Sequence, residues 1–138
     1  MSFGRGGSCG GTILDKKTVL SAAHCFENGY SRVQVEVGFT NHRDSPQKFN
    51  VKSVEMHPEY NPRILDFDVA ILKLSFPLIW TDYVQPACLP DASFTPEENG
   101  QKGFISGWGT TKYGMLCSSV IPFSTFKYQK IVSTNARY

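Results

Sequence analysis

The stretch Leu20-Ser21-Ala22-Ala23-His24-Cys25 places a histidine after two small residues and before a cysteine, directly behind an apolar run. Imidazole titrates near neutral pH and is the most common general base in enzymes. An isolated histidine is more often structural or exposed. The two alanines leave room for the ring of His24 to lie against the backbone. His24 is therefore a candidate general base that requires a second group to orient it.

Short strand-forming runs lie on both sides of this stretch. Thr12-Ile13-Leu14 and Thr18-Val19-Leu20 flank Asp15-Lys16-Lys17, a polar tripeptide that suits a hairpin loop. No segment keeps a helical period of useful length. We therefore predict an all-β fold, an antiparallel barrel or sandwich. Its other strands are expected within residues 33–37, 49–54, 69–74 and 104–109.

Residues 86–100 interrupt this pattern. They contain three prolines and little periodicity, which indicates a linker that crosses the surface between two strand-rich units. We expect the first unit over residues 1–85 and the second over residues 101–138. The second unit is too short to bury a stable core without help from elsewhere.

The composition excludes several function classes. Hydrophobic residues make up 41% and charged residues 19% of the 138 residues, which is typical of a globular protein. A net charge of +2 gives no strong field for nucleic acid or an anionic membrane, so no nucleic-acid partner is expected. No apolar run approaches the roughly 20 residues that span a bilayer. The start has no apolar core typical of a signal peptide, so either the protein is cytosolic or the beginning of a secreted precursor is absent.

The four cysteines stand at positions 9, 25, 88 and 117. No pair has the two-residue spacing of a zinc knuckle, and adjacent His24 and Cys25 do not readily supply two ligands to one tetrahedral ion. We therefore expect no metal site and no cofactor. Disulfides in an oxidising compartment are favoured, although the cysteine count does not determine their connectivity.

A partner for His24 is sought among the carboxylates. Asp66 and Asp68 stand at the mouth of the apolar run 69–74. A carboxylate in such a place is often only a solvated turn residue. Asp68 directly precedes the run, whereas Asp66 is interpreted as a loop carboxylate.

Six blocks of the sequence, taken in order, resemble those of the chymotrypsin-like and trypsin-like serine proteases (peptidase S1). They cover nearly the whole chain, and Asp68 follows His24 at close to the family spacing. The blocks are Cys9-Gly10-Gly11-Thr12-Ile13-Leu14, Leu20-Ser21-Ala22-Ala23-His24-Cys25, His57-Pro58-Glu59-Tyr60-Asn61, Asp68-Val69-Ala70-Ile71-Leu72, Val84-Gln85-Pro86-Ala87-Cys88-Leu89-Pro90 and Gly107-Trp108-Gly109.

This resemblance implies a fold and two residue roles. Residues 1–85 would form an antiparallel six-stranded barrel, 86–100 the crossover, and 101–138 the first strands of an incomplete second barrel. His24 would act as general base and then as general acid, and Asp68 would orient it. Ser21 would help to anchor Asp68 through its hydroxyl group.

The resemblance also implies roles for the cysteines. Cys9 and Cys25 would form a disulfide that clamps the loop carrying His24. Cys88 resembles the cysteine that often links such a domain to an upstream propeptide. Gly103 falls where a further cysteine is common, and Cys117 has no clear counterpart.

The nucleophile of the family is not among these residues. It belongs to a Gly-Asp-Ser-Gly-Gly block, which the sequence lacks. Ser8 precedes His24, against the family order, and Ser118 and Ser119 lack the glycine neighbours of an oxyanion hole. The Ile-Val-Gly-Gly start of an activated protease is also absent. We therefore expect a fragment that is inactive alone.

Two functions remain open at this stage. The first is a serine endopeptidase of extracellular location, acting on protein or peptide substrates, of which this chain carries only His24 and Asp68. The second is a non-catalytic serine protease homologue that acts as a binding or regulatory module. The residue at the nucleophile position distinguishes them.

Overall fold

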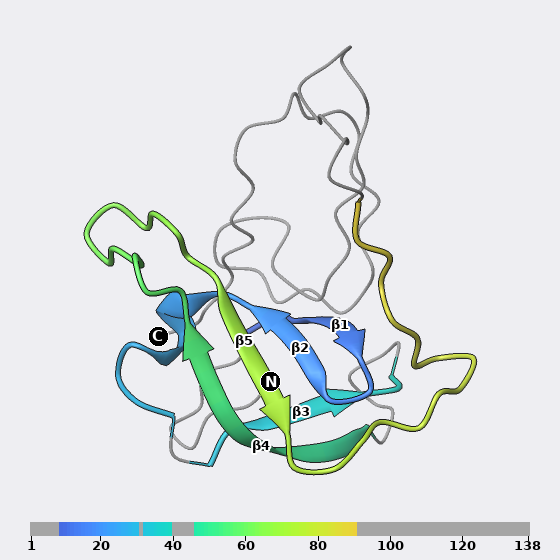
Figure 1. Ribbon diagram of the computed structural model, residues 1–138. Helices are drawn as coiled ribbons and strands as arrows, with labels where there is room; N and C mark the ends of the chain where they lie inside the picture. Colours follow the sequence, from blue (N-terminus) through green and yellow to red (C-terminus); the bar gives the residue numbers. More distant parts are fainter. Residues whose placement is uncertain (1–8, 31, 40–45, 91–138) are drawn as a thin grey trace, which may run out of the picture.

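The computed structural model describes residues 9–30, 32–39 and 46–90. Every neighbouring pair of strands is antiparallel, and the order across the sheet is β1-β2-β5-β4-β3. The sheet curls into a half-barrel (Figure 1), so the predicted all-β class is confirmed. The elements are β1 (Thr12–Asp15), β2 (Thr18–Ser21), the 3-10 helix η1 (Ala23–Phe26), β3 (Gln34–Val37), β4 (Gln47–Met56) and β5 (Ala70–Leu74).

Some of the predicted features lie outside the described residues. These are the strand at 104–109, the second barrel over 101–138 and the crossover beyond residue 90. The first part of the crossover, residues 86–90, is described. It runs beside β1, where the Ala87 N–H donates a hydrogen bond to the Ile13 carbonyl at 2.9 Å.

The β1–β2 hairpin is tighter than the sequence suggested. Asp15 is the last residue of β1 rather than part of the loop, so only Lys16 and Lys17 connect the strands. The Asp15 carboxylate accepts a hydrogen bond from the Lys17 N–H at 2.7 Å. The Asp15 side chain thus supplies the hydrogen-bond acceptor for the Lys17 N–H in the turn, and this bond stabilises the two-residue connection.

The curl of the sheet comes from β4. Residues 47–50 of this strand pair with β3, whereas residues 51–56 pair with β5. The register shifts between Val51 and Ser53, so Lys52 is an extra residue that has no pairing partner on β5. A bulge of this kind bends the strand and increases its twist. One ten-residue strand can therefore belong to both sides of the half-barrel.

The core fills the inside of this curl. Val33, Val35 and Val37 are buried and alternate with polar residues, as the sequence predicted. Gly38 ends the run with φ +80°, a left-handed conformation that glycine adopts without strain. The other large side chains that are almost fully buried come from β2, η1, β5 and the segment after it: Val19, Phe26, Leu72, Leu74, Leu78 and Val84.

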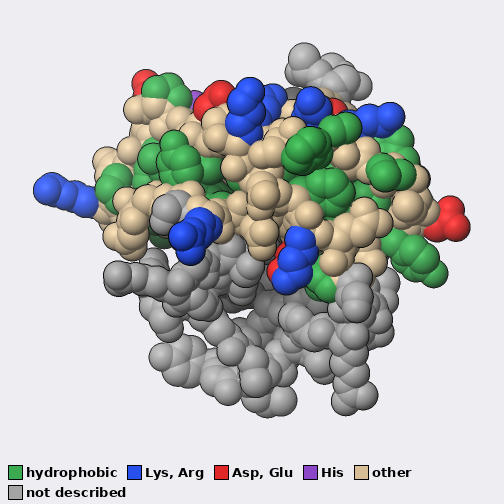
Figure 2. Space-filling view, turned by 90° about the horizontal axis from the view of Figure 1, so that it is seen from below, with side chains coloured by type: hydrophobic (Ala, Val, Ile, Leu, Met, Phe, Trp, Pro, Cys, Tyr) green, Lys and Arg blue, Asp and Glu red, His purple; other side chains and the backbone are tan. Residues whose placement is uncertain are grey.

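The outer surface is mixed in character. On the face shown in Figure 2, Lys and Arg side chains are interspersed with apolar and uncharged groups over the described residues. None of the described helices is long and apolar enough to cross a membrane.

Candidate active site

His24 and Asp68 meet at one edge of the sheet because their strands are neighbours. β2 and β5 are antiparallel, and Ser21 at the end of β2 lies opposite Ala70 at the start of β5. His24 follows Ser21 by three residues and Asp68 precedes Ala70 by two. The end of one strand and the beginning of the next therefore bring together residues 44 positions apart in the chain.

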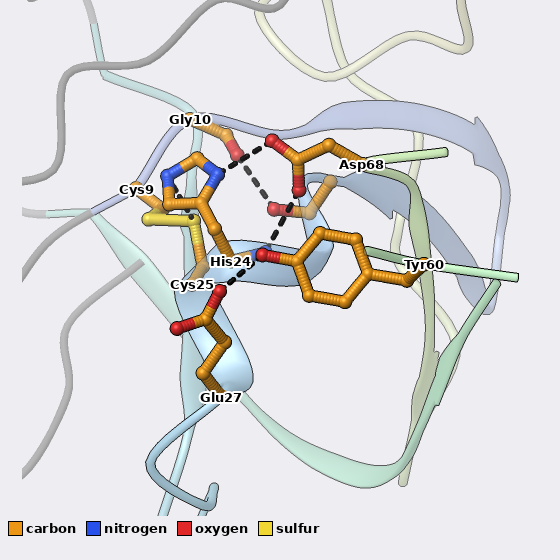
Figure 3. A network of polar contacts seen from close by, with 8 residues as sticks. Cys9, Gly10, His24, Cys25, Glu27, Tyr60 and Asp68 are labelled. Carbon is orange, nitrogen blue, oxygen red and sulfur yellow. Dashed lines mark hydrogen bonds and ion pairs between the residues drawn. A yellow bond between two sulfur atoms is a disulfide. The ribbon is translucent and has the colours of Figure 1, made fainter. Parts of the chain in front are cut away.

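Two hydrogen bonds join these residues, as Figure 3 shows. The backbone N–H of His24 donates to Oδ1 of Asp68 at 2.8 Å. The ring Nδ1 of His24 lies 2.7 Å from Oδ2 of the same carboxylate. An ionised carboxylate only accepts hydrogen bonds, so Nδ1 carries the proton in this contact. In the neutral ring, Nε2 then keeps its lone pair and can accept a proton.

Both side chains are withdrawn from solvent. The side chain of Asp68 has an exposed fraction of 0% and that of His24 has 8%. A buried carboxylate is costly unless hydrogen bonds satisfy it, and here both of its oxygens have a donor. Ala23 is also completely buried, in agreement with the expected need for a small residue before the histidine.

A tight turn aims the carboxylate of Asp68. The Val69 N–H donates to the Phe67 carbonyl at 2.7 Å, which turns the chain around Asp68 and leaves Val69 outside β5. Phe67 has φ +49°, unusual for a residue with a side chain. Its ring stacks on His57, with centroids 4.7 Å apart and planes 9° from parallel. This stacking holds the strained residue in place.

Asp66 has a different environment from Asp68. Its Oδ1 accepts from the Phe67 N–H at 3.1 Å, and its carbonyl accepts from the Asn61 N–H at 3.0 Å. These bonds shape the loop between β4 and β5. The structure thus places Asp68 against His24, while Asp66 organises the turn.

A disulfide also restrains the segment that carries His24. Cys9 and Cys25 are bonded, with Cα atoms 6.5 Å apart, as predicted. The expectation for Ser21 is not met, because its hydroxyl donates to the Gly10 carbonyl at 3.0 Å. A hydroxyl has one proton, so Ser21 does not donate it to Asp68 as well. Ser21 instead fastens the strand before η1 to the segment carrying Cys9.

One contact at the site could not be predicted from the sequence. The hydroxyl of Tyr60 donates to the carboxylate of Glu27, which follows η1 (Figure 3). Tyr60 also packs against the core. The pair connects the loop after β4 to the helix that carries His24. The only sequence signal was the position of Tyr60 in His57-Pro58-Glu59-Tyr60-Asn61, which indicated a loop but no partner.

Several residues weighed in the sequence lie outside the described ranges. They are Ser8, Gly103, Gly107-Trp108-Gly109, Cys117, Ser118 and Ser119. Cys88 is described, and its thiol is exposed and not in a disulfide.

The amino-acid sequence is similar to those of known proteins. The sequence model of the family described as Trypsin matches residues 1–129. Transmembrane protease serine 9 of Rattus norvegicus is 44% identical over 110 residues, which cover 77% of this chain and 10% of that protein. Trypsin 5G1 of Aedes aegypti is 34% identical over 113 residues, covering 82% of this chain and 42% of the relative. Trypsin, alkaline C of Manduca sexta is 36% identical over 108 residues, covering 78% and 42%. The chain thus spans less than half the length of each of these relatives.

Proposed function

The chain belongs to the trypsin family, and on that premise we propose that it is part of a serine endopeptidase in which His24 and Asp68 are two members of the catalytic triad. One observation carries the proposal. The Nδ1 of His24 is bound to a fully buried carboxylate at 2.7 Å, which leaves Nε2 as the basic nitrogen. That arrangement is the one a general base of this family requires.

Each residue has a defined task in the proposed reaction. Nε2 of His24 takes the proton of the serine hydroxyl as the oxygen attacks the scissile carbonyl carbon, and the ring becomes an imidazolium. The same proton then passes to the leaving amine. Asp68 keeps the ring in the required tautomer and stabilises its positive charge through the Nδ1 contact. The substrate class is protein or peptide.

We also propose that the nucleophile belongs to residues outside these 138. The sequence contains no Gly-Asp-Ser-Gly-Gly block. An oriented imidazole contributes proton transfer, worth about 10²–10⁴-fold, but neither the covalent step nor an oxyanion hole. The 138 residues by themselves are therefore expected to hydrolyse no peptide.

An extracellular location belongs to the same proposal. The Cys9–Cys25 disulfide supports it, since disulfides persist in oxidising compartments. The exposed, free thiol of Cys88 is accessible to a cysteine of an upstream propeptide, and we propose a disulfide between them.

The test is labelling of the longest natural polypeptide that contains this chain with a fluorophosphonate, which reacts with an activated serine. We expect one labelled serine downstream of Tyr138. Replacement of His24 by alanine should abolish the labelling, while the matched variant His42→Ala should retain it. A polypeptide that contains the complete domain, carries another residue at the nucleophile position and takes no label would instead identify a non-catalytic binding homologue.

A further inference from the structure

Asp68 lies at the centre of a three-residue turn. The N–H of Val69 donates to the carbonyl of Phe67 at 2.7 Å, which closes the turn around Asp68. The Asp68 carboxylate points at the ring of His24, whose Nδ1 lies 2.7 Å from Oδ2 (Figure 3). The direction of the carboxylate depends on the two flanking residues, because a backbone rotation at either one turns the Cα–Cβ bond of Asp68.

His57, the first residue after β4, contacts both residues that flank Asp68. Its backbone N–H donates to the carbonyl of Val69 at 2.9 Å. Its ring stacks on the ring of Phe67, with centroids 4.7 Å apart and planes 9° from parallel. One residue therefore restrains the turn on both sides of Asp68, by a backbone hydrogen bond on one side and by a ring contact on the other.

The ring of His57 is itself fixed by its own segment. Its Nδ1 accepts a hydrogen bond from the N–H of Glu59 at 3.2 Å. Its carbonyl accepts another from the N–H of Tyr60 at 3.0 Å. Both bonds belong to the turn that follows β4, so the orientation of the ring is set before Phe67 packs against it.

Phe67 needs this restraint because its backbone is strained. Its φ is +49°, in the left-handed region that residues with a side chain rarely adopt. Such a conformation persists only where the surrounding structure holds it. The side chain of Phe67 has an exposed fraction of 46%, so burial in the core does not supply the restraint. The stack on His57 does.

We propose that His57 is a positioning residue, which orients Asp68 and, through Asp68, the ring of His24. This role rests on the proposed function, in which Asp68 keeps His24 in the tautomer that a general base requires. His57 acts through Asp68 and takes no part in the proton transfer. The ring contact with Phe67 is the part of the arrangement that a side-chain substitution can remove, since the backbone bond to Val69 remains.

The test is nitrogen-15 NMR of the His24 ring in the full chain, which needs no serine nucleophile. In His57→Ala the stack is lost, so we expect part of the His24 population to shift toward the Nε2–H tautomer. Ile64→Ala is the matched control, because Ile64 lies in the same loop with an exposed fraction of 69%, and it should leave the tautomer unchanged. An unchanged tautomer in folded His57→Ala would overturn the proposal.

Two further variants separate positioning from a general loss of stability. His57→Phe keeps an aromatic face but lacks the nitrogen, and it should retain the parent tautomer. Phe67→Asn places at this position a residue that adopts positive φ more readily, so in that background His57→Ala should shift the tautomer less. Failure of His57→Phe to retain the parent tautomer, or equal shifts in the two backgrounds, would exclude the stack as the cause. A variant that only weakens the fold leaves the tautomer of the folded state unchanged.

Kinetics provide the second measurement. In a serine-bearing form of the protein, His57→Ala should lower kcat by about 10²-fold, the size of loss expected when a catalytic group is slightly misplaced. KM should stay unchanged, since the substitution alters the general base rather than substrate binding. A loss that appears in KM alone would contradict the role. Fluorophosphonate labelling of the parent tests the proposed function and the His24 tautomer tests the positioning, so the failure of either is seen separately.

Discussion

Nδ1 of His24 and Oδ2 of Asp68 lie 2.7 Å apart, although the residues are 44 positions apart in the chain. The contact follows from the antiparallel pairing of β2 with β5, which brings the end of one strand to the start of the other. On the histidine side, the Cys9–Cys25 disulfide fixes the loop. On the aspartate side, the turn closed by Phe67 and Val69 aims the carboxylate. The relationship is therefore maintained from both sides.

The role of this contact can be measured on the tautomer of His24. In Asp68→Asn the carboxylate that accepts from Nδ1–H is replaced by an amide, so we expect the ring to shift toward the Nε2–H tautomer. Nitrogen-15 NMR of the histidine ring reports this change directly. Asp66→Asn is the matched control and should leave the ring unchanged. In a serine-bearing form of the protein, Asp68→Asn should lower kcat by about 10⁴-fold. An unaltered tautomer in Asp68→Asn would show that the carboxylate does not orient the ring.

Leu72 is expected to be essential to the stability of the half-barrel. It is completely buried at the centre of β5, where truncation leaves a cavity. Leu72→Ala should lower the free energy of unfolding by about 2–5 kcal/mol in urea denaturation. Ile64 has an exposed fraction of 69%, and Ile64→Ala should change this free energy by less than about 0.5 kcal/mol. Similar losses in the two variants would contradict the assigned core.

The disulfide should stabilise the chain mainly by restricting its unfolded state. Cys9 and Cys25 close a loop with a sequence separation of 16, for which the chain-entropy model predicts about 3 kcal/mol. The double variant Cys9→Ala and Cys25→Ala should therefore unfold at a lower urea concentration than the parent. Cys88→Ala, at an exposed cysteine outside any disulfide, serves as the control and should unfold with the parent.

Asp15 should make stability depend on pH at the acid end. The backbone N–H of Lys17 and, to a smaller extent, the hydroxyl of Thr18 lower the pKa of this carboxyl below its ordinary value. A lowered pKa in the folded state contributes stability that is present above the ordinary pKa and lost as the pH falls through the folded value. The stability difference between the parent and Asp15→Asn should therefore shrink across that acid window. Thr18→Val should raise the pKa of Asp15 part of the way, as measured by carbon-13 NMR titration. No movement of the pKa would exclude the hydroxyl as a cause.

Tyr60 and Glu27 should be energetically coupled. Their hydrogen bond joins the loop after β4 to the segment after η1. We expect Tyr60→Phe and Glu27→Gln each to lower the free energy of unfolding modestly. The double variant should lose less than the sum of the two, by about 1 kcal/mol. Strict additivity in this double-mutant cycle would mean that the bond contributes nothing in solution.

The strand content and the identities of the residues that meet follow from the amino-acid sequence alone. Alternation at Val33, Val35 and Val37 predicted a half-buried strand because successive side chains of a strand point to opposite faces. The blocks around His24 and Asp68 predicted the family and the pairing of Cys9 with Cys25. These features are local residue patterns or motifs in a fixed order, and both can be recognised in the amino-acid sequence without the fold.

How these residues face one another depends on the three-dimensional fold. The bulge at Lys52 shifts the register of β4, and no residue pattern in that strand predicts the shift. Ser21 bonds Gly10 rather than Asp68, and Tyr60 reaches Glu27 across 33 positions. The nearness of the His24 Nε2 to the sulfur of Cys25 depends on the turn of η1. Such contacts arise from the relative placement of strands and loops, because a hydrogen bond forms only when donor and acceptor lie within a few tenths of an ångström of about 2.9 Å, which sequence spacing does not specify.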